Sequence, residues 1–566
     1  MKRRLLPILM TLVLVCALPI WAAFVTSGDV TNPLVCTAWA DTAEGERNSG
    51  TTQETFTEVT DETTLKKAVA DGKSVRMTQD ITLTSSLCIE KAVTLDMDGH
   101  VLTRMHTYEY DMVVIRSDAT LTLIDSNTGN LQHRFNAGET GWTKAADNAT
   151  GDGIVTVTGG VIYGDAGRSI INPCGIKILK GKLEMYGGSI VGIRNVYNAN
   201  GGGVYVSDQC TFNMYGGSIK GCYVFSDGGG VYVAAGGTFT MSGSSAITNC
   251  KGSRGGAVYN AGTFTMRDNS HIADCIYNSS IASGGGVHNK GTFTVEGGSI
   301  TGSVNDHNRE QSSDDICNEN KLDVSEGITI SCNVNVGYGG TISKGTFTGR
   351  VWIFWEGTIL GGTFTNEVIN YEGTIKAGEF TGEVTNTSGG TISGGTFDKN
   401  VANESGATIS GGTFNENVTN KTNATLNGGI FYGGVTNDGG KIEDGAYETV
   451  KFNSDNGAQA KEEKVLRGQK VAKPTDDPTK SGYTFIGWED ADGAYDFSKS
   501  VTAPLTLTAK WEKNPSSGGY YYYPTTDTKA DDTKGSPKTA DPGVALYAAL
   551  SLLSLTGMVA LNGKKR

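Results

Sequence analysis

The central part of the chain carries apolar residues in columns that repeat along the sequence. From about Lys182, a Val recurs at intervals of 27, 27 and 29 residues, and a Phe and an Ile follow with a similar drifting interval. These columns are Val204, Val231, Val258 and Val287; Phe212, Phe239, Phe264 and Phe293; and Ile219, Ile247, Ile272 and Ile300. Columns that share one interval predict a solenoid with three short strands in each coil.

From Thr341 the interval shortens to about 17 residues, and a polar column joins the apolar ones. The apolar columns are Ile342, Ile359, Ile375, Ile392, Ile409 and Leu426; Phe347, Phe364, Phe380, Phe397, Phe414 and Phe431; and Val351, Val368, Val384, Val401, Val418 and Val435. The polar column is Asn370, Asn386, Asn403, Asn420 and Asn437. Stacked Asn side chains can hydrogen-bond along the axis at the ~4.8 Å strand spacing. We therefore expect slim triangular coils that bury their side chains against the coils above and below.

The segment before the repeats predicts a cap and a first set of strands. Thr64–Gly72 reads as a short amphipathic helix that stops at Gly, and it should cover the open end of the sheets. Residues 41–62 show no core pattern and are expected to be a spacer, so the solenoid should span residues 63–446. Strands rich in Val, Ile and Thr are predicted at Ser74–Met77, Ile81–Leu83, Val93–Met97 and Ala119–Ile124.

These blocks resemble the right-handed parallel β-helix (pectin-lyase-like) family, and Gly255–Val258 resembles the repeat motif of bacterial surface adhesins. The handedness comes from the resemblance alone. Residues 447–513 resemble the Listeria–Bacteroides (internalin-type) repeat through Gly482–Trp488 and Ala509–Trp511. That resemblance implies a small β-grasp-like spacer without catalysis. The predicted fold class is all-β, a parallel β-helix followed by this module and a low-complexity linker over residues 514–540.

Both ends of the chain predict export and attachment to a cell envelope. Lys2–Arg4 and the apolar run Leu5–Ala23 are typical of a signal peptide, expected to span residues 1–40. An uncleaved membrane anchor is the alternative. The uncharged run Gly543–Leu561 and the basic tail Lys564–Arg566 predict a membrane span within residues 541–566.

A short motif precedes that run and resembles a Gram-positive sortase sorting signal. It consists of Ser536, Pro537, Lys538, Thr539 and Ala540. The resemblance implies cleavage after Thr539 by a sortase and covalent linkage to peptidoglycan. Ser536 and Ala540 depart from the Leu and Gly of the usual signal, and a plain membrane anchor is the alternative. Either form places the protein on the cell surface.

Composition and charge exclude some functions. The 566 residues include 79 Gly and carry a net charge of −13, which argues against nucleic acid because phosphate binding needs clustered Lys and Arg. The six His are scattered without ligand spacing, so no metal and no cofactor are predicted. Catalytic residues are not assigned either. The acidic pairs Asp96/Asp98, Asp147/Asp152 and Asp314/Asp315 are expected in strands, turns and solvated loops.

Cysteine positions predict buried thiols. Cys222, Cys250 and Cys275 each follow the column Ile by three residues, so they should form a small inward-facing column of free thiols. Cys317 and Cys332 stand on either side of an apparent loop and are the better candidates for a disulfide.

Two aromatic groups are the candidate binding residues. Tyr205, Tyr232, Tyr259 and His288 each follow an inward Val and should stack outside the coils as an exposed ladder. Trp352, Phe354, Trp355 and Tyr371 form a second patch. Stacked exposed rings suit sugar faces or a partner protein. Alternatively, the ladder only stiffens the sheet, and residues 303–337 fold over the patch.

The sequence predicts a non-catalytic, adhesin-like surface solenoid that binds glycans or host surfaces. Two alternatives stay open: a polysaccharide lyase or glycoside hydrolase on the same scaffold, and a structural spacer without a ligand.

Overall fold

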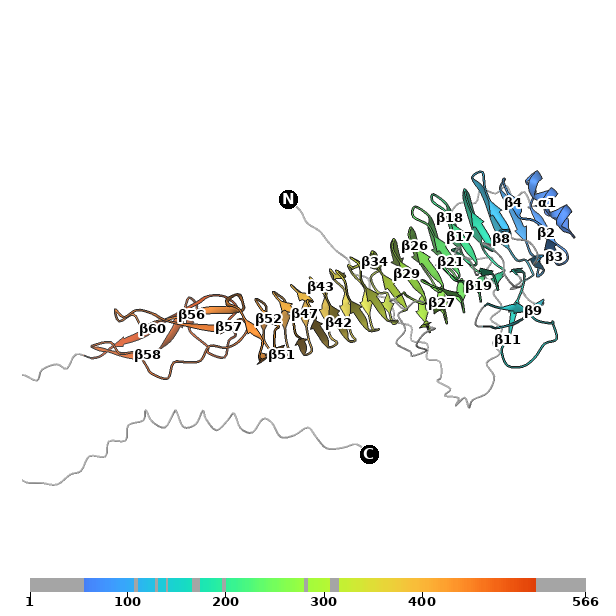
Figure 1. Ribbon diagram of the computed structural model, residues 1–566. Helices are drawn as coiled ribbons and strands as arrows, with labels where there is room; N and C mark the ends of the chain where they lie inside the picture. Colours follow the sequence, from blue (N-terminus) through green and yellow to red (C-terminus); the bar gives the residue numbers. More distant parts are fainter. Residues whose placement is uncertain are drawn as a thin grey trace, which may run out of the picture. The chain divides into compact units, whose positions relative to one another are not determined.

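The structure is a computed structural model that describes residues 55–105, 110–127, 131–138, 141–164, 174–195, 200–278, 283–305 and 315–515. Parallel strands that stack coil upon coil form most of it (Figure 1). The all-β solenoid expected from the repeats is confirmed. The expected signal peptide, sorting motif and C-terminal span lie outside the described residues.

Sheet A runs along the whole solenoid. Its strands are β1 (Thr57–Val59), β2 (Val75–Met77), β5 (Val93–Asp96), β8 (Ala119–Ile124), β14 (Gly181–Met185), β18 (Thr211–Met214), β22 (Thr238–Met241), β26 (Thr263–Met266), β30 (Thr292–Val295), β34 (Lys321–Val324), β37 (Thr341–Ile342), β40 (Thr358–Ile359), β43 (Thr374–Ile375), β46 (Thr391–Ile392), β49 (Thr408–Ile409), β52 (Thr425–Leu426) and β55 (Lys441–Ile442). Neighbouring strands pair in parallel, and the columns read from the sequence lie in register.

Sheet C forms a second long wall. Its strands are β4 (Leu87–Ile89), β7 (Val113–Ile115), β13 (Ile176–Ile178), β17 (Val204–Val206), β21 (Val231–Val233), β25 (Val258–Asn260), β29 (Val287–Asn289), β33 (Ile316–Asn318), β36 (Val334–Val336), β39 (Val351–Ile353), β42 (Val368–Tyr371), β45 (Val384–Thr387), β48 (Val401–Asn403), β51 (Val418–Lys421) and β54 (Val435–Asp438). The first residue of each strand, most often Val, points inward, and the second residue points outward.

The remaining walls differ between the two coil sizes. In the large coils they are sheet B, with β3 (Ile81–Leu83), β6 (Val101–Arg104), β12 (Val161–Tyr163), β15 (Ser189–Val191), β19 (Ser218–Lys220), β23 (Ala246–Thr248), β27 (His271–Ala273) and β31 (Ser299–Thr301), and sheet E, with β16 (Arg194–Asn195), β20 (Tyr223–Val224), β24 (Lys251–Gly252), β28 (Ile276–Tyr277) and β32 (Val304–Asn305). In the small coils sheet F replaces both, with β35 (Thr329–Ile330), β38 (Thr346–Phe347), β41 (Thr363–Phe364), β44 (Glu379–Phe380), β47 (Thr396–Phe397), β50 (Thr413–Phe414) and β53 (Ile430–Phe431).

The expectation of three strands per coil is confirmed for the small coils and wrong for the large ones. From β16 onward, each large coil adds a strand of sheet E, as β20 and β24 do. These strands are only two residues long, and their residues change type from coil to coil. Two positions without a recurring apolar residue leave no periodic signal in the sequence.

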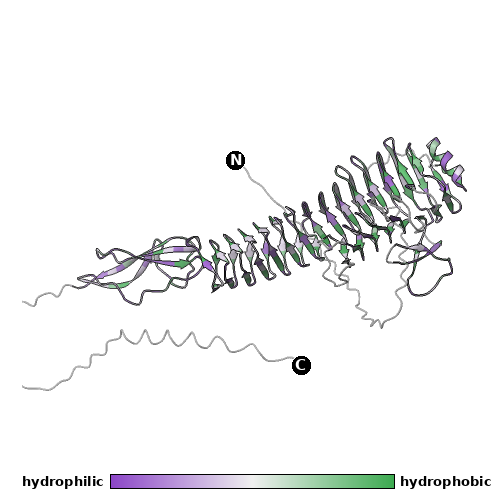
Figure 2. Ribbon diagram, in the orientation of Figure 1, coloured by the Kyte–Doolittle hydropathy of each residue, from purple (hydrophilic) through white to green (hydrophobic). Residues whose placement is uncertain are grey.

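Stacked aromatic rings fill the centre of the coils. In the large coils, Phe212, Phe239, Phe264 and Phe293 stack on sheet A with ring centroids 4.7 to 4.9 Å apart. In the small coils the Phe column lies on sheet F, where the centroids are 4.7 to 5.2 Å apart. All these rings are buried, and Figure 2 colours many strands of the large coils as hydrophobic. Burial of each Phe stabilises the fold by roughly 1.5–3 kcal/mol.

A buried ladder of amides runs along sheet C of the small coils, as expected. Asn386 Nδ2 donates to Asn403 Oδ1 at 2.9 Å, and Asn403 Nδ2 donates to Asn420 Oδ1 at 2.9 Å. Each amide also reaches a backbone carbonyl, so its two N–H groups are both used. A second ladder, which the 27-residue columns had not revealed, joins Asn260 and Asn289 of the large coils to Asn318 of the first small coil.

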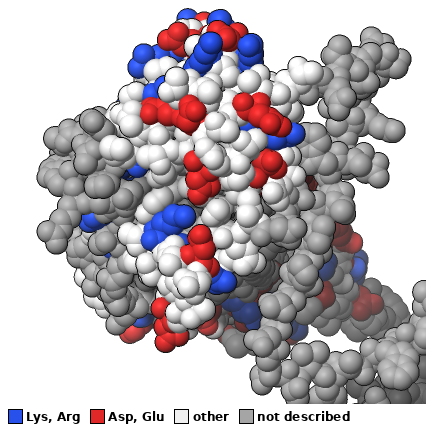
Figure 3. Space-filling view, turned by 90° about the vertical axis from the view of Figure 1, so that its right-hand side faces the viewer, with Lys and Arg blue, Asp and Glu red and all other residues white. Residues whose placement is uncertain are grey.

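A helix closes the N-terminal end of the stack. Helix α1 (Glu62–Asp71) follows the N-cap Asp61 and ends at Gly72, whose φ of 77° is the left-handed conformation that Gly adopts readily. Leu65 and Val69 of α1 are buried in the solenoid core, which confirms the capping role. Figure 3 looks onto this end and shows acidic and basic side chains interspersed.

The solenoid begins earlier than expected, within the segment read as a spacer. Strand β1 pairs in parallel with β2, and Val59 is buried. Three residues are too few to carry a periodic pattern, so the sequence did not reveal this strand.

A small antiparallel sheet interrupts the large coils. Sheet D consists of β9 (Gln132–Asn136), β10 (Thr143–Lys144) and β11 (Ile154–Thr158) (Figure 1). Phe135 and Trp142 form its own buried cluster with Tyr163 of β12. The repeats gave no indication of this insertion because it is not part of any column.

The C-terminal module is a mixed sheet that joins the last coil. Sheet G has the order β57 (Lys461–Leu466), β56 (Tyr447–Asn453), β60 (Leu505–Lys513), β58 (Tyr483–Asp490) and β59 (Gly493–Ala494), after the 3₁₀ turn η1 (Asp444–Ala446). The Phe431 N–H donates to the Arg467 carbonyl at 2.8 Å, and Gln469 Nε2 donates to the Phe431 carbonyl. The backbone of the last Phe in the column is therefore paired with the module.

The Asn ladder makes a testable stability difference. We expect Asn403→Ala to lower the free energy of unfolding by about 1–3 kcal/mol, because the Asn386 amide and the Thr425 carbonyl lose buried partners. Asn437→Ala is the matched control, since Asn437 is exposed at the end of the ladder and water can replace it. Urea unfolding followed by circular dichroism measures both. If both variants lowered the free energy of unfolding by the same amount, burial would not be what makes the ladder stabilising.

Candidate functional site

The outer face of sheet C holds every predicted binding residue of the ladder and one residue of the patch in a single line. Strand pairing aligns the outward residues of nine successive coils, which we call the outer column: Lys177, Tyr205, Tyr232, Tyr259, His288, Cys317, Asn335, Trp352 and Ile369. In the sequence the two aromatic groups look separate, because the column positions between them hold Cys317 and Asn335, which are not aromatic. The number of residues per coil also changes between the two groups. The two groups therefore lie along one continuous column of sheet C.

The ladder stacks as the register predicts. The ring centroids of Tyr205 and Tyr232 lie 5.1 Å apart, and those of Tyr232 and Tyr259 lie 5.0 Å apart. His288 continues the stack 5.2 Å beyond Tyr259, with an interplanar angle of 8°. The rings thus face one another along the axis and present their edges to the surroundings.

The ladder is less exposed than expected. Tyr205 and Tyr232 are half-buried, while Tyr259 is 6% exposed and His288 is 1% exposed. The guanidinium of Arg254 lies over the Tyr259 ring at 5.1 Å, and Glu319 approaches His288. Burial raises the pKa of Tyr259 to about 12, so its hydroxyl stays protonated at neutral pH.

Ion pairs hold the cationic side chains in place beside the ladder. Arg254 donates from Nε to Asp227 Oδ1 at 2.9 Å and from Nη2 to Asp227 Oδ2 at 2.6 Å, which is a bidentate pair. Lys177 lies 3.3 Å from the Asp111 carboxylate and over the Tyr205 ring. The ladder is therefore an edge-on aromatic strip flanked by fixed charges.

The second patch is the exposed part of the site. Tyr338, Phe354, Trp355 and Tyr371 lie where sheet C ends and turns towards sheet A, and we call them the aromatic corner. Trp355 is 43% exposed, Tyr338 47% and Tyr371 45%. The Tyr338 ring lies 4.8 Å from the Trp355 ring, and the Phe354 ring lies edge-on to Trp355 at 5.1 Å.

The backbone holds this corner in an uncommon conformation. Tyr338 has a φ of 50° and Trp355 a φ of 43°, in the left-handed region that bulky residues rarely adopt. Trp352 lies beside the corner on the outer column, under the Arg350 guanidinium. The same turn position is also left-handed in the next two coils, at Glu372 and Ser388, so this conformation belongs to the repeated turn.

Two expectations about this region need correction. Residues 303–337 were an alternative cover for the patch, but the described residues 315–337 form a coil of the stack itself, and Asn335 lies beside Trp352 on the outer column. Tyr338 was missed as a member of the corner. It follows Val336 by two residues, just as Trp355 follows Ile353, so aligning these two coils would have found it.

One group of side chains in the described residues could hold a metal ion. His288, Cys317 and Glu319 each offer a ligand atom, and these atoms lie within 4.8 Å of one another. His288 Nε2 lies 3.2 Å from Glu319 Oε1, and Lys290 Nζ lies 2.9 Å from Glu319 Oε2. Burial opposes ionisation of Glu319, but His288 and Lys290 outweigh it and lower the pKa of the carboxyl. The sequence hid this group because its members come from two coils.

The acidic residues singled out in the sequence have structural contacts where they are described. Asp96 is buried, pairs with Arg76 at 2.7 Å and accepts the Ser126 N–H. Asp315 is buried and accepts the N–H groups of Ser303 and Asn333. Asp98 accepts the Ser126 hydroxyl at 3.1 Å. Asp147 and Asp152 are exposed in the segment between β10 and β11, and Asp314 lies outside the described residues.

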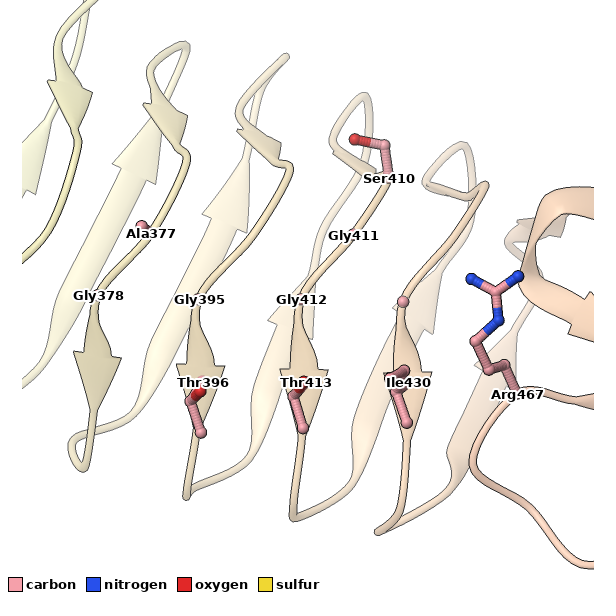
Figure 4. A pocket seen from close by; sticks show the side chains of 11 residues that line it. Ala377, Gly378, Gly395, Thr396, Ser410, Gly411, Gly412, Thr413, Ile430 and Arg467 are labelled. Atoms are coloured by element: carbon pink, nitrogen blue, oxygen red, sulfur yellow. The ribbon is translucent and has the colours of Figure 1, made fainter. Parts of the chain in front are cut away.

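A shallow groove of about 560 Å³ lies along sheet F, next to the C-terminal module (Figure 4). Most of its lining residues are Gly and Thr from the repeated turn before each sheet F strand, and Arg467 lies at one end of the groove. The lining residues are Ala377, Gly378, Gly395, Thr396, Ser410, Gly411, Gly412, Thr413, Gly429, Ile430 and Arg467. Backbone atoms dominate this surface, and Arg467 is the one ionisable residue in its lining. The groove offers hydrogen-bonding groups but no acid–base pair.

Comparison with known proteins finds a match that lies within the C-terminal module. Residues 449–510 match the family Flg_new, the Listeria-Bacteroides repeat domain. This segment is similar to that repeat, as its motifs indicated. Repeats of this family occur in extracellular surface proteins, which fits a repetitive surface protein. No curated protein and no solved structure matches the chain.

Among the described residues, no helix is long and apolar enough to cross a membrane. The expected span Gly543–Leu561 lies outside them, as do the signal peptide and the sorting motif.

The cysteine expectations have different outcomes. Cys222, Cys250 and Cys275 are buried free thiols in the core, as predicted. A bridge between Cys317 and Cys332 is wrong, since neither forms a disulfide. Cys317 stands on the outer column, whereas Cys332 lies inside the core cluster, so the wall of the coil separates them.

Burial predicts which thiols react. It shields the sulfurs of Cys222, Cys250 and Cys275 from solvent, and it raises the pKa of Cys222 and Cys275. Burial acts in the same direction on Cys250, but hydrogen bonds from these two neighbours outweigh it and lower the pKa of Cys250, which is equally inaccessible. We expect iodoacetamide to leave Cys222, Cys250 and Cys275 unmodified in the folded protein and to modify them after unfolding. Cys88, which is half-buried, is the internal control and should react first. Peptide-resolved mass spectrometry measures each site, and native modification of Cys250 as fast as that of Cys88 would contradict the prediction.

Proposed function

We propose that the protein is a non-catalytic, adhesin-like solenoid of the cell surface that binds glycans or a partner surface through the aromatic corner. The observation that carries this proposal is the exposure of Tyr338, Trp355 and Tyr371, each more than two-fifths exposed, on one corner of a stacked scaffold. Exposed aromatic groups of this kind are typical of interaction sites on soluble proteins.

The chemistry of the corner suits a ligand with both apolar and polar faces. Aromatic rings pack against the C–H faces of sugars, while Arg350 and Glu367 form an ion pair at 2.8 Å beside Trp352 and can serve hydroxyl groups. The rings sit on paired strands and on a constrained turn, so little conformational entropy is lost when a ligand binds.

Attachment to the envelope is part of the same proposal. Residues 1–40 would direct export, and a sortase would cleave after Thr539 of the Ser536–Ala540 motif and link the chain to peptidoglycan. The similarity of residues 449–510 to a repeat of extracellular surface proteins supports this placement. The module would then act as a spacer between the solenoid and the wall.

Binding by the corner has a direct test on a glycan array. We expect Trp355→Ala to weaken binding roughly threefold to tenfold, the range for one aromatic contact. Tyr432→Ala is the matched control, because Tyr432 is equally exposed in the last small coil and should leave binding unchanged. Full binding by Trp355→Ala would remove the corner from the site.

The same glycan panel separates the alternatives. Release of reducing sugars or unsaturated uronates would support the polysaccharide-degrading enzyme instead. No binding and no turnover would leave the structural spacer.

Wall attachment is tested by cell fractionation. In a Gram-positive host with a sortase, we expect Thr539→Ala to move the protein from the fraction that wall hydrolases release to the membrane fraction. A Thr528→Ala variant in the preceding linker controls for expression and should stay in the wall fraction. An unchanged distribution for Thr539→Ala would favour a plain membrane anchor.

A further inference from the structure

The group formed by His288, Cys317 and Glu319 lies where the solenoid changes its coil size. His288 belongs to β29, in the last coil that uses sheets B and E. Cys317 belongs to β33, in the first coil that uses sheet F, and the two residues are direct partners across parallel strands. Glu319 follows on the same coil as Cys317, and its N–H donates to the Asn289 carbonyl at 2.8 Å. Strand pairing therefore fixes the positions of all three residues.

The buried imidazole at this place lacks hydrogen-bond partners. His288 is 1% exposed, and neither Nδ1 nor Nε2 makes a hydrogen bond. Glu319 Oε1 is 3.2 Å from Nε2, in contact but without hydrogen-bond geometry. Buried polar nitrogens are rarely left unsatisfied, because each costs about 1–3 kcal/mol. An ion between the imidazole and the carboxylate would satisfy the nitrogen that faces Glu319.

The next residue of the outer column shows the same feature. Asn335 pairs with Cys317 across β33 and β36, and it is 2% exposed. Its Oδ1 is buried without a hydrogen-bond partner. A carbonyl oxygen of this kind is a ligand for divalent cations, so it is available as a further donor beside the thiol.

We propose that His288, Cys317 and Glu319 bind a divalent transition-metal ion of the Zn²⁺ class. Imidazole nitrogen, thiolate sulfur and carboxylate oxygen are the three ligand types that Zn²⁺ takes in proteins. Ca²⁺ and Mg²⁺ prefer oxygen ligands only, so the thiol and the imidazole select against them. The thiol loses its proton to the solvent when it binds, and the imidazole binds in its neutral form.

Two anionic ligands would neutralise the ion itself. A thiolate and a carboxylate carry the two negative charges that match a divalent cation, and Lys290, which pairs with the second oxygen of Glu319 at 2.9 Å, adds one positive charge beside the site. Glu319 Oε1 faces His288 and is the oxygen that would bind the ion. Lys290 then orients the carboxylate, as a hydrogen-bonding partner of a metal ligand does.

Metal binding at this point would fasten the two blocks of the solenoid together. The ion would join β29 of the last large coil to β33 of the first small coil, on the outer face. The ion would also keep the Cys317 thiol coordinated. Tyr338 of the aromatic corner lies in the coil next to Cys317 and Glu319, but no residue of the corner is one of the three metal ligands, so the proposal does not depend on glycan binding.

Cobalt(II) spectroscopy on the full chain tests the proposal. We strip the purified, reduced protein with EDTA, remove the chelator and titrate CoCl₂, then displace it with ZnCl₂. We expect one equivalent to produce a thiolate-to-cobalt charge-transfer band that Zn²⁺ abolishes. Cys317→Ser and His288→Gln should lose the band. Glu319→Gln should raise the dissociation constant for Co²⁺ at least about tenfold. Removing a residue that only hydrogen-bonds to a metal ligand already lowers metal affinity by this factor.

Two controls keep the result interpretable. Cys332→Ala removes a buried thiol in the core of the coil that also carries Cys317 and should retain the full band. Circular dichroism and the thermal midpoint of each variant show whether it folds, and Zn²⁺ should raise the midpoint of the unmodified protein. The absence of a thiolate band in the unmodified protein, or its persistence in folded Cys317→Ser, would overturn the proposal.

Discussion

In-register stacking of parallel coils is the constraint on which the rest of the structure depends. One coil contributes a single Phe, Ile and Val to the interior, and these side chains are buried only when identical ones lie above and below. The ring spacing of 4.7 to 5.2 Å in the Phe column therefore follows the strand spacing. The Asn ladder obeys the same rule, because each amide finds its partner in the next coil. A stack of this kind needs covered ends, which α1 and the backbone around Arg467 provide.

Stacking also decides how chemistry arises on the outside. Residues that lie 29 positions apart, such as Tyr259 and His288, become ring neighbours in adjacent strands. His288 and Cys317 meet in the same way at the change of coil size. The aromatic corner is assembled from successive turns, with Tyr338 and Trp355 contributed by neighbouring coils. Function on this scaffold is therefore a property of columns, and each column can change its chemistry from coil to coil.

The predictable part of the structure is the part that repeats. The Ile, Phe and Val columns lie in register in the small coils, and β3 and β8 have the predicted bounds. Sheet E and sheet D were missed, since two-residue strands and a single insertion leave no periodic trace. Within the candidate site, the stacking of the ladder was predictable from the Val column, but its burial was not. Arg254 and Glu319 cover Tyr259 and His288, and their positions follow no column.

The sequence by itself determined which side chains face inward, which face outward and how many residues each coil contains. These properties depend on the alternation of residues along a strand and on the interval between coils, and both can be read from one chain. Only the tertiary structure decided which outward residues stay exposed, that Cys317 and Cys332 lie on opposite sides of a wall, and that His288, Cys317 and Glu319 converge. The physical reason is that exposure and convergence depend on long polar side chains and turns from neighbouring coils, whose paths the repeat does not encode.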